Sequence, residues 1–242
     1  DCKIKAKTNN RLGFSRKERL MTDHLIFYSG GLASWATAKR VAEKHGTKNL
    51  KMLFTDTMIE DKDLYRFLDE SAVNVGGELI KIADGRTPWE VMKDVRLLAN
   101  SRLDPCSRIL KREMATNWVK EHYPDPTEVV LYIGMNWDEE HRYKRSQGFW
   151  KPYTVESPLL EPPYLMKDDM ITWCNKEGVK HPRLYDMGFP HNNCGGGCVK
   201  AGAAHFKHLL KELPEVYAEW EAEEEKMRNF LEKDVTILTY TK

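Results

Sequence analysis

The chain has 242 residues, of which 41% are hydrophobic, and this is enough for one sizeable core. Its formal net charge of +1 at pH 7 gives no overall attraction to nucleic acid or to a membrane surface. The longest apolar runs, such as 24–28 and 129–133, are too short to span a bilayer, and no secretory signal pattern opens the chain. We therefore expect a cytoplasmic protein that makes no contact with a membrane.

The two ends of the chain differ in character from the rest. Residues 1–20 carry seven Lys and Arg residues and almost nothing apolar, which is typical of a flexible basic arm. The compact part is therefore expected to begin near Met21. Residues 234–241 have the pattern of a strand that no turn or closing element follows. This pattern leads us to expect that the chain is a truncated form of something longer.

Strands and helices are predicted to alternate between residues 24 and 134. Short apolar runs predict strands over 24–28, 50–54, 78–82 and 128–134. Apolar residues at helical spacing predict helices over 34–44, 62–71, 88–98 and 109–122. This alternation indicates an α/β protein with a parallel twisted sheet and helices on both faces, a Rossmann-like arrangement. In such sheets, ligands bind at the carboxyl ends of the strands.

The amino-acid composition changes from residue 149 onward. Pro, Gly and aromatic residues dominate up to residue 202, and helical spacing returns over 203–231 with a break near Pro214. We therefore divide the chain into the arm (1–20), a nucleotide-binding α/β domain (21–148) and a C-terminal region (149–242). The C-terminal region is predicted to be a loop-rich lid followed by helices, packed on the same domain.

A glycine loop joins the first predicted strand to the first predicted helix; it reads Ser29-Gly30-Gly31-Leu32-Ala33-Ser34. Glycines let backbone N–H groups approach a phosphate, and the helix N-terminus adds the positive end of its dipole. The serine hydroxyls supply further donors. The Walker pattern of kinases and GTPases is absent. The loop is predicted to bind the phosphate end of an adenine nucleotide; a plain Gly-Gly turn is the alternative.

This loop resembles the PP-loop of the adenine nucleotide alpha hydrolases, which cleave ATP between the α and β phosphates. Within that superfamily the chain is similar to the phosphoadenosine phosphosulfate reductase group, including its phage-encoded members, from about residue 24 to residue 202. The further segments that carry the resemblance, in order, are 54–57, 64–68, 132–139 with Arg142, 157–160, 167–170, and 184–189 with Cys194.

The resemblance implies an adenine nucleotide alpha hydrolase fold and the reduction of an adenylyl sulfate to sulfite. It implies that the nucleotide, ATP or an adenylyl sulfate, contacts residues 29–34, Asp56 and Gly134. Asp56 and Arg142 would be the catalytic residues. On position alone, Asp56 would suit Mg²⁺ on the phosphates, or would be a turn or helix-capping acid. Arg142 and Arg145 would suit phosphate or sulfate, because arginine offers a planar fork of donors.

The chain has five cysteines, an odd number that argues against a disulfide framework. Cys194 and Cys198 are separated by three glycines, and Cys106 lies among Arg102, Arg108, Lys111 and Arg112, which favour a thiolate. Cys106, Cys194 and Cys198 are predicted to hold a 4Fe–4S cluster with one iron left open. The alternatives are zinc, with His191 or His205 as fourth ligand, and small residues that only pack.

Cys174 is predicted to be a core residue, and Cys2 is assigned no role. Sulfonucleotide reductases that carry a cluster typically have a Cys-Cys pair upstream and a Cys-x-x-Cys pair downstream. Here Cys106 stands alone, and no nucleophilic cysteine follows Cys198. Three cysteines beside a PP-loop also resemble the cluster-dependent transfer-RNA thiolases, which adenylate a base oxygen and replace it with sulfur.

Three functions therefore stay open. The first is reduction of an adenylyl sulfate, in which a reductant protein would be a partner. The second is ATP-dependent adenylation and sulfur insertion into a nucleic acid. The third is a non-catalytic nucleotide-binding subunit. A homodimer is a further expectation, and a small-molecule nucleotide is the ligand in all three.

Overall fold

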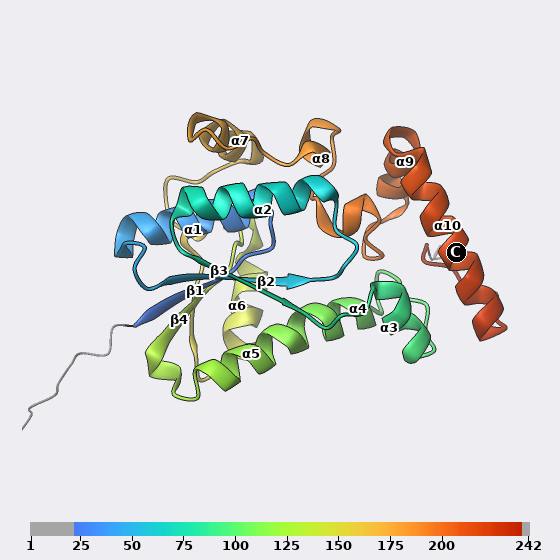
Figure 1. Cartoon of the computed structure of the whole chain (residues 1–242), viewed down its shortest axis with the longest axis horizontal. Coiled ribbons are helices and arrows are strands. Elements are labelled where there is room, and N and C mark those ends of the chain that lie inside the picture. Colours follow the sequence, from blue (N-terminus) through green and yellow to red (C-terminus); the bar gives the residue numbers. More distant parts are fainter. Residues whose placement is uncertain (1–21, 239–242) are drawn as a thin grey trace, which may run out of the picture.

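The computed structural model describes residues 22–238. The predicted basic arm, Cys2 and the end of the predicted C-terminal strand lie outside the described residues. Five parallel strands form one sheet in the order β3-β2-β1-β4-β5. The strands are β1 (Asp23–Phe27), β2 (Leu50–Asp56), β3 (Glu78–Ala83), β4 (Val129–Tyr132) and β5 (Thr154–Glu156). The predicted α/β class, with helices on both faces of a parallel sheet, is confirmed (Figure 1).

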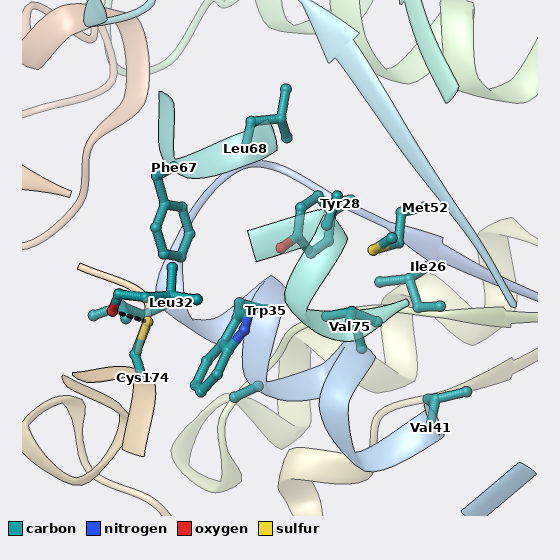
Figure 2. Packing of buried hydrophobic residues seen from close by; sticks show 14 of the residues in the cluster. Ile26, Tyr28, Leu32, Trp35, Val41, Met52, Phe67, Leu68, Val75 and Cys174 are labelled. Carbon is teal, nitrogen blue, oxygen red and sulfur yellow. Dashed lines mark hydrogen bonds between the residues drawn. The ribbon is translucent and has the colours of Figure 1, made fainter. Parts of the chain in front are cut away.

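One face of the sheet is covered by α1 (Leu32–His45) and α2 (Lys62–Val75), and α7 (Lys167–Lys176) packs on α1 (Figure 1). α2 begins where the Asp61 carboxylate accepts from the Asp63 N–H at 2.8 Å, and it ends at Gly76, whose left-handed backbone suits glycine. Figure 2 shows the core of this layer, in which the fully buried Trp35 packs among aliphatic side chains. Cys174 is fully buried in the same core, as predicted.

The opposite face is covered by α5 (Met114–His122) and α6 (Glu140–Phe149) (Figure 1). α5 continues a short α4 (Pro105–Ser107) through a π-helical segment, η1 (Arg108–Glu113). The predicted helix over 109–122 therefore begins with one widened turn, a feature that occurs often at functional sites.

A third layer lies at one end of the sheet, where α3 (Pro88–Asp94) meets α9 (Ala203–Glu212) and α10 (Pro214–Leu231) (Figure 1). α3 has a capping box between Thr87 and Glu90. The predicted break near Pro214 separates α9 from α10, since proline fits the first turn of a helix. Trp220 of α10 packs on Trp89 of α3 with ring centroids 4.9 Å apart.

The region from 149 to 202 contributes β5 to the sheet edge and also contains α7, α8 (Arg183–Asp186) and the 3-10 turns η4 (Pro158–Leu160) and η5 (Asn193–Gly196). Its loops between 185 and 200 line the site described below. β5 and α6 were not predicted. The predicted strand over 234–241 is wrong for its described part, because 234–238 have no regular structure and the Ile237 N–H donates to Glu224 of α10 instead. Between residues 22 and 238, no helix combines the length and the apolar character needed to cross a membrane.

Candidate functional site

The strand order places a topological switch point between β1 and β4. From β1 the chain runs outward to β2 and β3, and it then returns to place β4 and β5 on the other side of β1. The loops that follow β1 and β4 therefore leave the sheet in opposite directions and open a crevice at the carboxyl ends of the strands. The glycine loop follows β1, and Gly134 follows β4.

The glycine loop is built to bring its backbone to a ligand. Gly31 is the N-cap of α1 with extended backbone, and Gly30 has a φ of 72° in the left-handed region that favours glycine. A Cβ atom at Gly30 would lie 2.9 Å from Leu64 Cδ2. The Ser34 hydroxyl donates to the Gly31 carbonyl at 2.8 Å and lies 3.4 Å from the Ser29 hydroxyl. The loop therefore needs its first glycine for conformation and packing.

Gly134 touches the same loop from the end of β4. A Cβ atom there would lie 2.9 Å from backbone atoms of both Ala33 and Ser34. The two strand ends can approach this closely only because residue 134 has no side chain. The loop is also held from the far end of the chain, since the Asn192 amide, which is 2% exposed, donates to the Gly30 carbonyl at 2.9 Å.

A cavity of about 650 Å³ opens over the glycine loop, within the size range of small-molecule sites. It is lined mainly by the glycine loop, the residues after β4, the segment from α4 into η1 and the loops from 185 to 200, with further contributions from Phe27, Thr57, Pro88 and Trp220. A second cavity of about 410 Å³ adjoins it on the α5 and α6 side of the sheet. The two cavities share Phe27, Ser29, Lys111 and Ile133.

The walls of these cavities are strongly cationic, although the whole chain is almost neutral. The cationic side chains are Lys111, Arg112, Arg142, Arg145 and Lys200. Glu139 is the one carboxylate among the lining residues, and it pairs with Arg142. Two carboxylates that line neither cavity also pair with these cations: Glu60 with Lys111, and Asp104 with Arg112 and Lys200. The five cations still outnumber these three carboxylates by two, which favours a ligand with negative charge.

Lys111 stands where the two cavities meet, and its ammonium pairs with Glu60 at 3.0 Å. The Glu60 side chain is 1% exposed and also accepts from the Thr57 hydroxyl at 2.9 Å and from the Cys194 N–H at 2.5 Å. Burial by itself would lower the pKa of Lys111, but Glu60 and the two nearby cysteines raise it, so the ammonium stays charged. Glu60 thus ties the β2–α2 loop, η1 and the cysteine loop together.

Sequence reasoning missed Glu60 and named Lys111 only as a neighbour of Cys106. The available signal was the position of Glu60, four residues after the end of the second strand and one before the Asp61 cap. A carboxylate at that edge of a parallel sheet is well placed for a site, but its burial could not be seen in the sequence.

Cys106, Cys194 and Cys198 all line the 650 Å³ cavity. Cys194 has a φ of 52°, which is uncommon for a residue with a side chain and occurs most often where neighbours hold the backbone. A Cβ atom at Gly197 would lie 2.1 Å from the Trp220 ring, so the loop needs glycine to pass this side chain. The tight loop predicted between the two cysteines is therefore present and packed on α10.

The three thiols differ in acidity. A hydrogen bond from Cys194, the backbone N–H of Lys200 and the Lys111 ammonium together lower the pKa of Cys198 to about 6, against the effect of burial. The same hydrogen bond, burial and the Glu60 carboxylate hold the pKa of Cys194 well above its ordinary value. Burial raises the pKa of Cys106. Without a ligand, the pair of cysteines therefore shares one negative charge.

Among residues 22–238, no three His, Cys, Asp or Glu side chains are arranged to hold a single metal ion. The donor set itself fits an iron–sulfur cluster, because thiolates are the ligands such clusters use and the three cysteines line one cavity. The 4Fe–4S cluster and the zinc alternative both stay predictions.

Alkylation should reveal the low pKa of Cys198. In chelator-treated protein, the rate of reaction of Cys198 with iodoacetamide is expected to rise between about pH 5 and 7 and to level off above pH 7, because the thiolate predominates above a pKa of about 6. The modified peptide would be quantified by mass spectrometry. Cys174, which is fully buried, serves as the internal control and should stay unmodified. A rate that rises only near pH 8 to 9, about the range of an ordinary thiol, would contradict this assignment.

The two histidines considered as zinc ligands stack on each other, with ring centroids 5.1 Å apart. His205 Nε2 bonds the Gly196 carbonyl at 2.6 Å and so supports the cysteine loop. His191 lines the 650 Å³ cavity, and its Nδ1 is buried without a hydrogen-bond partner among the described residues. Burial, His205 and Lys111 lower the pKa of His191. Its imidazole is therefore neutral at pH 7.

Asp56 lies at the end of β2 but does not line either cavity, whereas Thr55 and Thr57 on either side of it do. Its carboxylate accepts from the Tyr65 hydroxyl at 2.7 Å and from the Met58 N–H at 2.8 Å. The second bond, two residues along, is that of an Asx turn, so the turn alternative has geometric support. Contact of Asp56 with a nucleotide or Mg²⁺ stays a prediction.

The residues after β4 lie at the mouth of the site. Arg142 lines the 650 Å³ cavity with 55% of its side chain exposed, and Arg145 lines the 410 Å³ cavity. Asp138 is exposed and lines neither. The predicted loop residues 29, 31, 33 and 34, together with Gly134, all line the larger cavity, whereas Gly30 and Leu32 support the loop from beneath.

No protein-family model and no curated protein matches this chain. Among solved structures, it is similar to the phosphoadenylyl-sulfate (PAPS) reductase from Candida auris, solved as a phosphate complex. The two are 17% identical, and the similarity covers 68% of this chain and 78% of that one, with a TM-score of 0.47.

Proposed function

We propose that this protein is an adenine-nucleotide enzyme of sulfur chemistry, which reduces an adenylyl sulfate to sulfite. The observation that carries the proposal is one cavity lined both by the glycine loop and by three cysteines. A phosphate held by the loop and a sulfur atom near the thiols would then lie within one ligand. Reduction breaks the bond between the sulfate sulfur and the bridging phosphate oxygen, so that sulfite and the nucleotide phosphate are released. The two electrons come from a dithiol reductant, which is oxidised to a disulfide.

The anionic end of the ligand would lie over the glycine loop. Its charges would face Lys111, Arg142 and Lys200, which line the same cavity. Among these, Lys111 is held by a buried carboxylate, so its ammonium is fixed in place before a ligand arrives. Preorganised cations of this kind bind phosphate or sulfate without first paying for reorientation.

The base would lie in the adjoining cavity of about 410 Å³. Apart from Lys111, Arg112 and Arg145, its walls are mainly apolar and aromatic, and Phe27 stacks on Trp150 with centroids 5.0 Å apart and planes 24° apart. Aromatic and aliphatic walls with a few polar groups suit a purine ring. The two cavities meet at Ser29 and Lys111, so one nucleotide could occupy both.

Cys106, Cys194 and Cys198 would hold the predicted 4Fe–4S cluster beside the bound sulfate. When bound, such a cluster supplies positive charge or electron transfer at the open iron. Cys198 is the best suited of the three to act as a ligand or nucleophile, because its thiol is the most acidic.

The test uses anaerobically purified protein, with iron and zinc content and the visible absorption spectrum measured first. The protein is then incubated with adenylyl sulfate and a dithiol, and separately with ATP and Mg²⁺ with or without RNA. Sulfite release that depends on adenylyl sulfate supports the proposal. Release of AMP and pyrophosphate that depends on RNA supports sulfur insertion instead. Nucleotide binding without any turnover supports a non-catalytic subunit, and the absence of binding overturns all three.

Sulfur insertion into a nucleic acid is the second candidate, and one surface feature favours it. Trp137 and Tyr164 lie with ring centroids 5.9 Å apart and are 45% and 55% exposed. Trp137 is in the loop between Gly134 and Glu139, both of which line the larger cavity. Exposed aromatic rings beside cationic side chains are a common platform for unpaired bases.

A further inference from the structure

Tyr185 of α8 reaches the glycine loop from the C-terminal region. A Cβ atom at Gly31 would lie 3.3 Å from the Tyr185 hydroxyl oxygen, and the side chain lines the 650 Å³ cavity. Burial raises the pKa of Tyr185, and the backbone N–H of Leu32, at the start of α1, partly offsets this rise. The hydroxyl therefore stays protonated at neutral pH and lies at the end of the loop where a phosphate is expected.

The position of Tyr185 is held by ionic contacts to α2. Arg183 pairs with the Asp61 carboxylate at 2.6 Å, and its N–H donates to Asp63 at 2.7 Å. Arg66 of α2 donates to the Lys180 carbonyl at 3.0 Å. These bonds link the segment before Tyr185 to the helix that packs beside the glycine loop, so the hydroxyl has little freedom to move.

The Tyr185 hydroxyl has an unused donor. No hydrogen bond from the Tyr185 O–H to an acceptor is found among residues 22–238, and the oxygen lies beside Gly31 and the Leu32 N–H. A hydroxyl that accepts from a backbone N–H is a better donor to a further group, because hydrogen bonds in a chain polarise one another. The positive end of the α1 dipole thereby polarises the Tyr185 hydroxyl toward the cavity.

We infer that Tyr185 is a positioning residue that donates from its hydroxyl to the anionic end of the nucleotide, and so completes the glycine loop from the C-terminal region. The inference rests on the proposed nucleotide site but not on the reaction carried out there. If Tyr185 has this role, the affinity of the glycine loop for phosphate depends on a residue some 150 positions away in the sequence. Asn192, which donates to the Gly30 carbonyl, is a second contact between the C-terminal region and the loop.

Tyr185→Phe tests this inference, since it removes one oxygen atom and keeps the ring. Calorimetry would measure the affinities of ATP, inorganic pyrophosphate and adenosine for the wild-type chain and for two variants. Tyr217→Phe is the matched control, because Tyr217 lies in α10 and lines neither cavity. The melting temperature of each variant would be measured alongside to show that it is folded.

We expect Tyr185→Phe to weaken ATP and pyrophosphate binding by about tenfold to a hundredfold, the value of a hydrogen bond to a charged group, and to leave adenosine binding within about twofold. Tyr217→Phe should change none of the three. Equal affinity of wild type and Tyr185→Phe for pyrophosphate and ATP would overturn the inference while the nucleotide site stands. If the wild-type chain bound no nucleotide at all, the proposed function would fail first. Equal weakening for adenosine would indicate loss of packing and would also overturn the inference.

Discussion

Replacing Lys111 by methionine is expected to lower the free energy of unfolding by about 3–5 kcal/mol and to abolish measurable nucleotide binding. The first effect arises because Glu60, with 1% of its side chain exposed, would be left in the interior without its ion-pair partner. The second arises because Lys111 is the one cation that lines both cavities. Chemical denaturation and calorimetry with ATP would measure the two effects.

The double variant Glu60→Gln/Lys111→Met separates these effects. Glutamine keeps hydrogen-bonding atoms for the Thr57 hydroxyl and the Cys194 N–H but carries no charge, so most of the lost stability should return. Nucleotide binding should not return, because the cation is still missing. Binding that recovers together with stability would mean that Lys111 serves the fold alone.

Replacing Gly134 by alanine is expected to lower stability by about 1–3 kcal/mol and to reduce nucleotide affinity by more than its effect on folding would explain. The new Cβ atom would lie 2.9 Å from the backbone of Ala33 and Ser34, so either β4 or the glycine loop must shift. The loop is the element that must present its N–H groups at a fixed distance from a phosphate. Thermal unfolding and ATP titration of the folded variant would measure both changes.

Gly148→Ala is the matched control for this variant. Gly148 lies in α6, and a Cβ atom there meets nothing within 4 Å, so alanine should stabilise the helix by a few tenths to about 1 kcal/mol. Nucleotide affinity should be unchanged. An affinity of Gly134→Ala equal to that of Gly148→Ala would contradict the close approach of β4 to the loop as a requirement for binding.

The glycine loop illustrates what local sequence can determine. An apolar strand, two glycines and a helical pattern over residues 24–44 define a strand-turn-helix unit without reference to the rest of the chain, and the structure has this unit over residues 23–45. The alternation of such units also determined the α/β class. These features depend on contacts between neighbours in sequence, so their signal lies in the pattern itself.

Elements with weak local patterns were missed for the same reason. α6 has no buried residue, so it lacks the apolar stripe that marks a helix in a sequence. β5 has three residues, which is too short for a pattern of alternation. The π-helical turn at η1 leaves no compositional trace that distinguishes it from an ordinary helix.

The residue types along the chain were enough to identify the glycine loop as a candidate phosphate site and the three cysteines as candidate metal or cluster ligands. Only the tertiary structure decided that they line one cavity, because this depends on the strand order that puts β4 beside β1. It also decided that Glu60 and Lys111 pair in the interior, and that the Asp56 carboxylate faces Tyr65 and not the cavities. Burial and long-range pairing arise from the packing of segments far apart in the chain, and no local pattern records them.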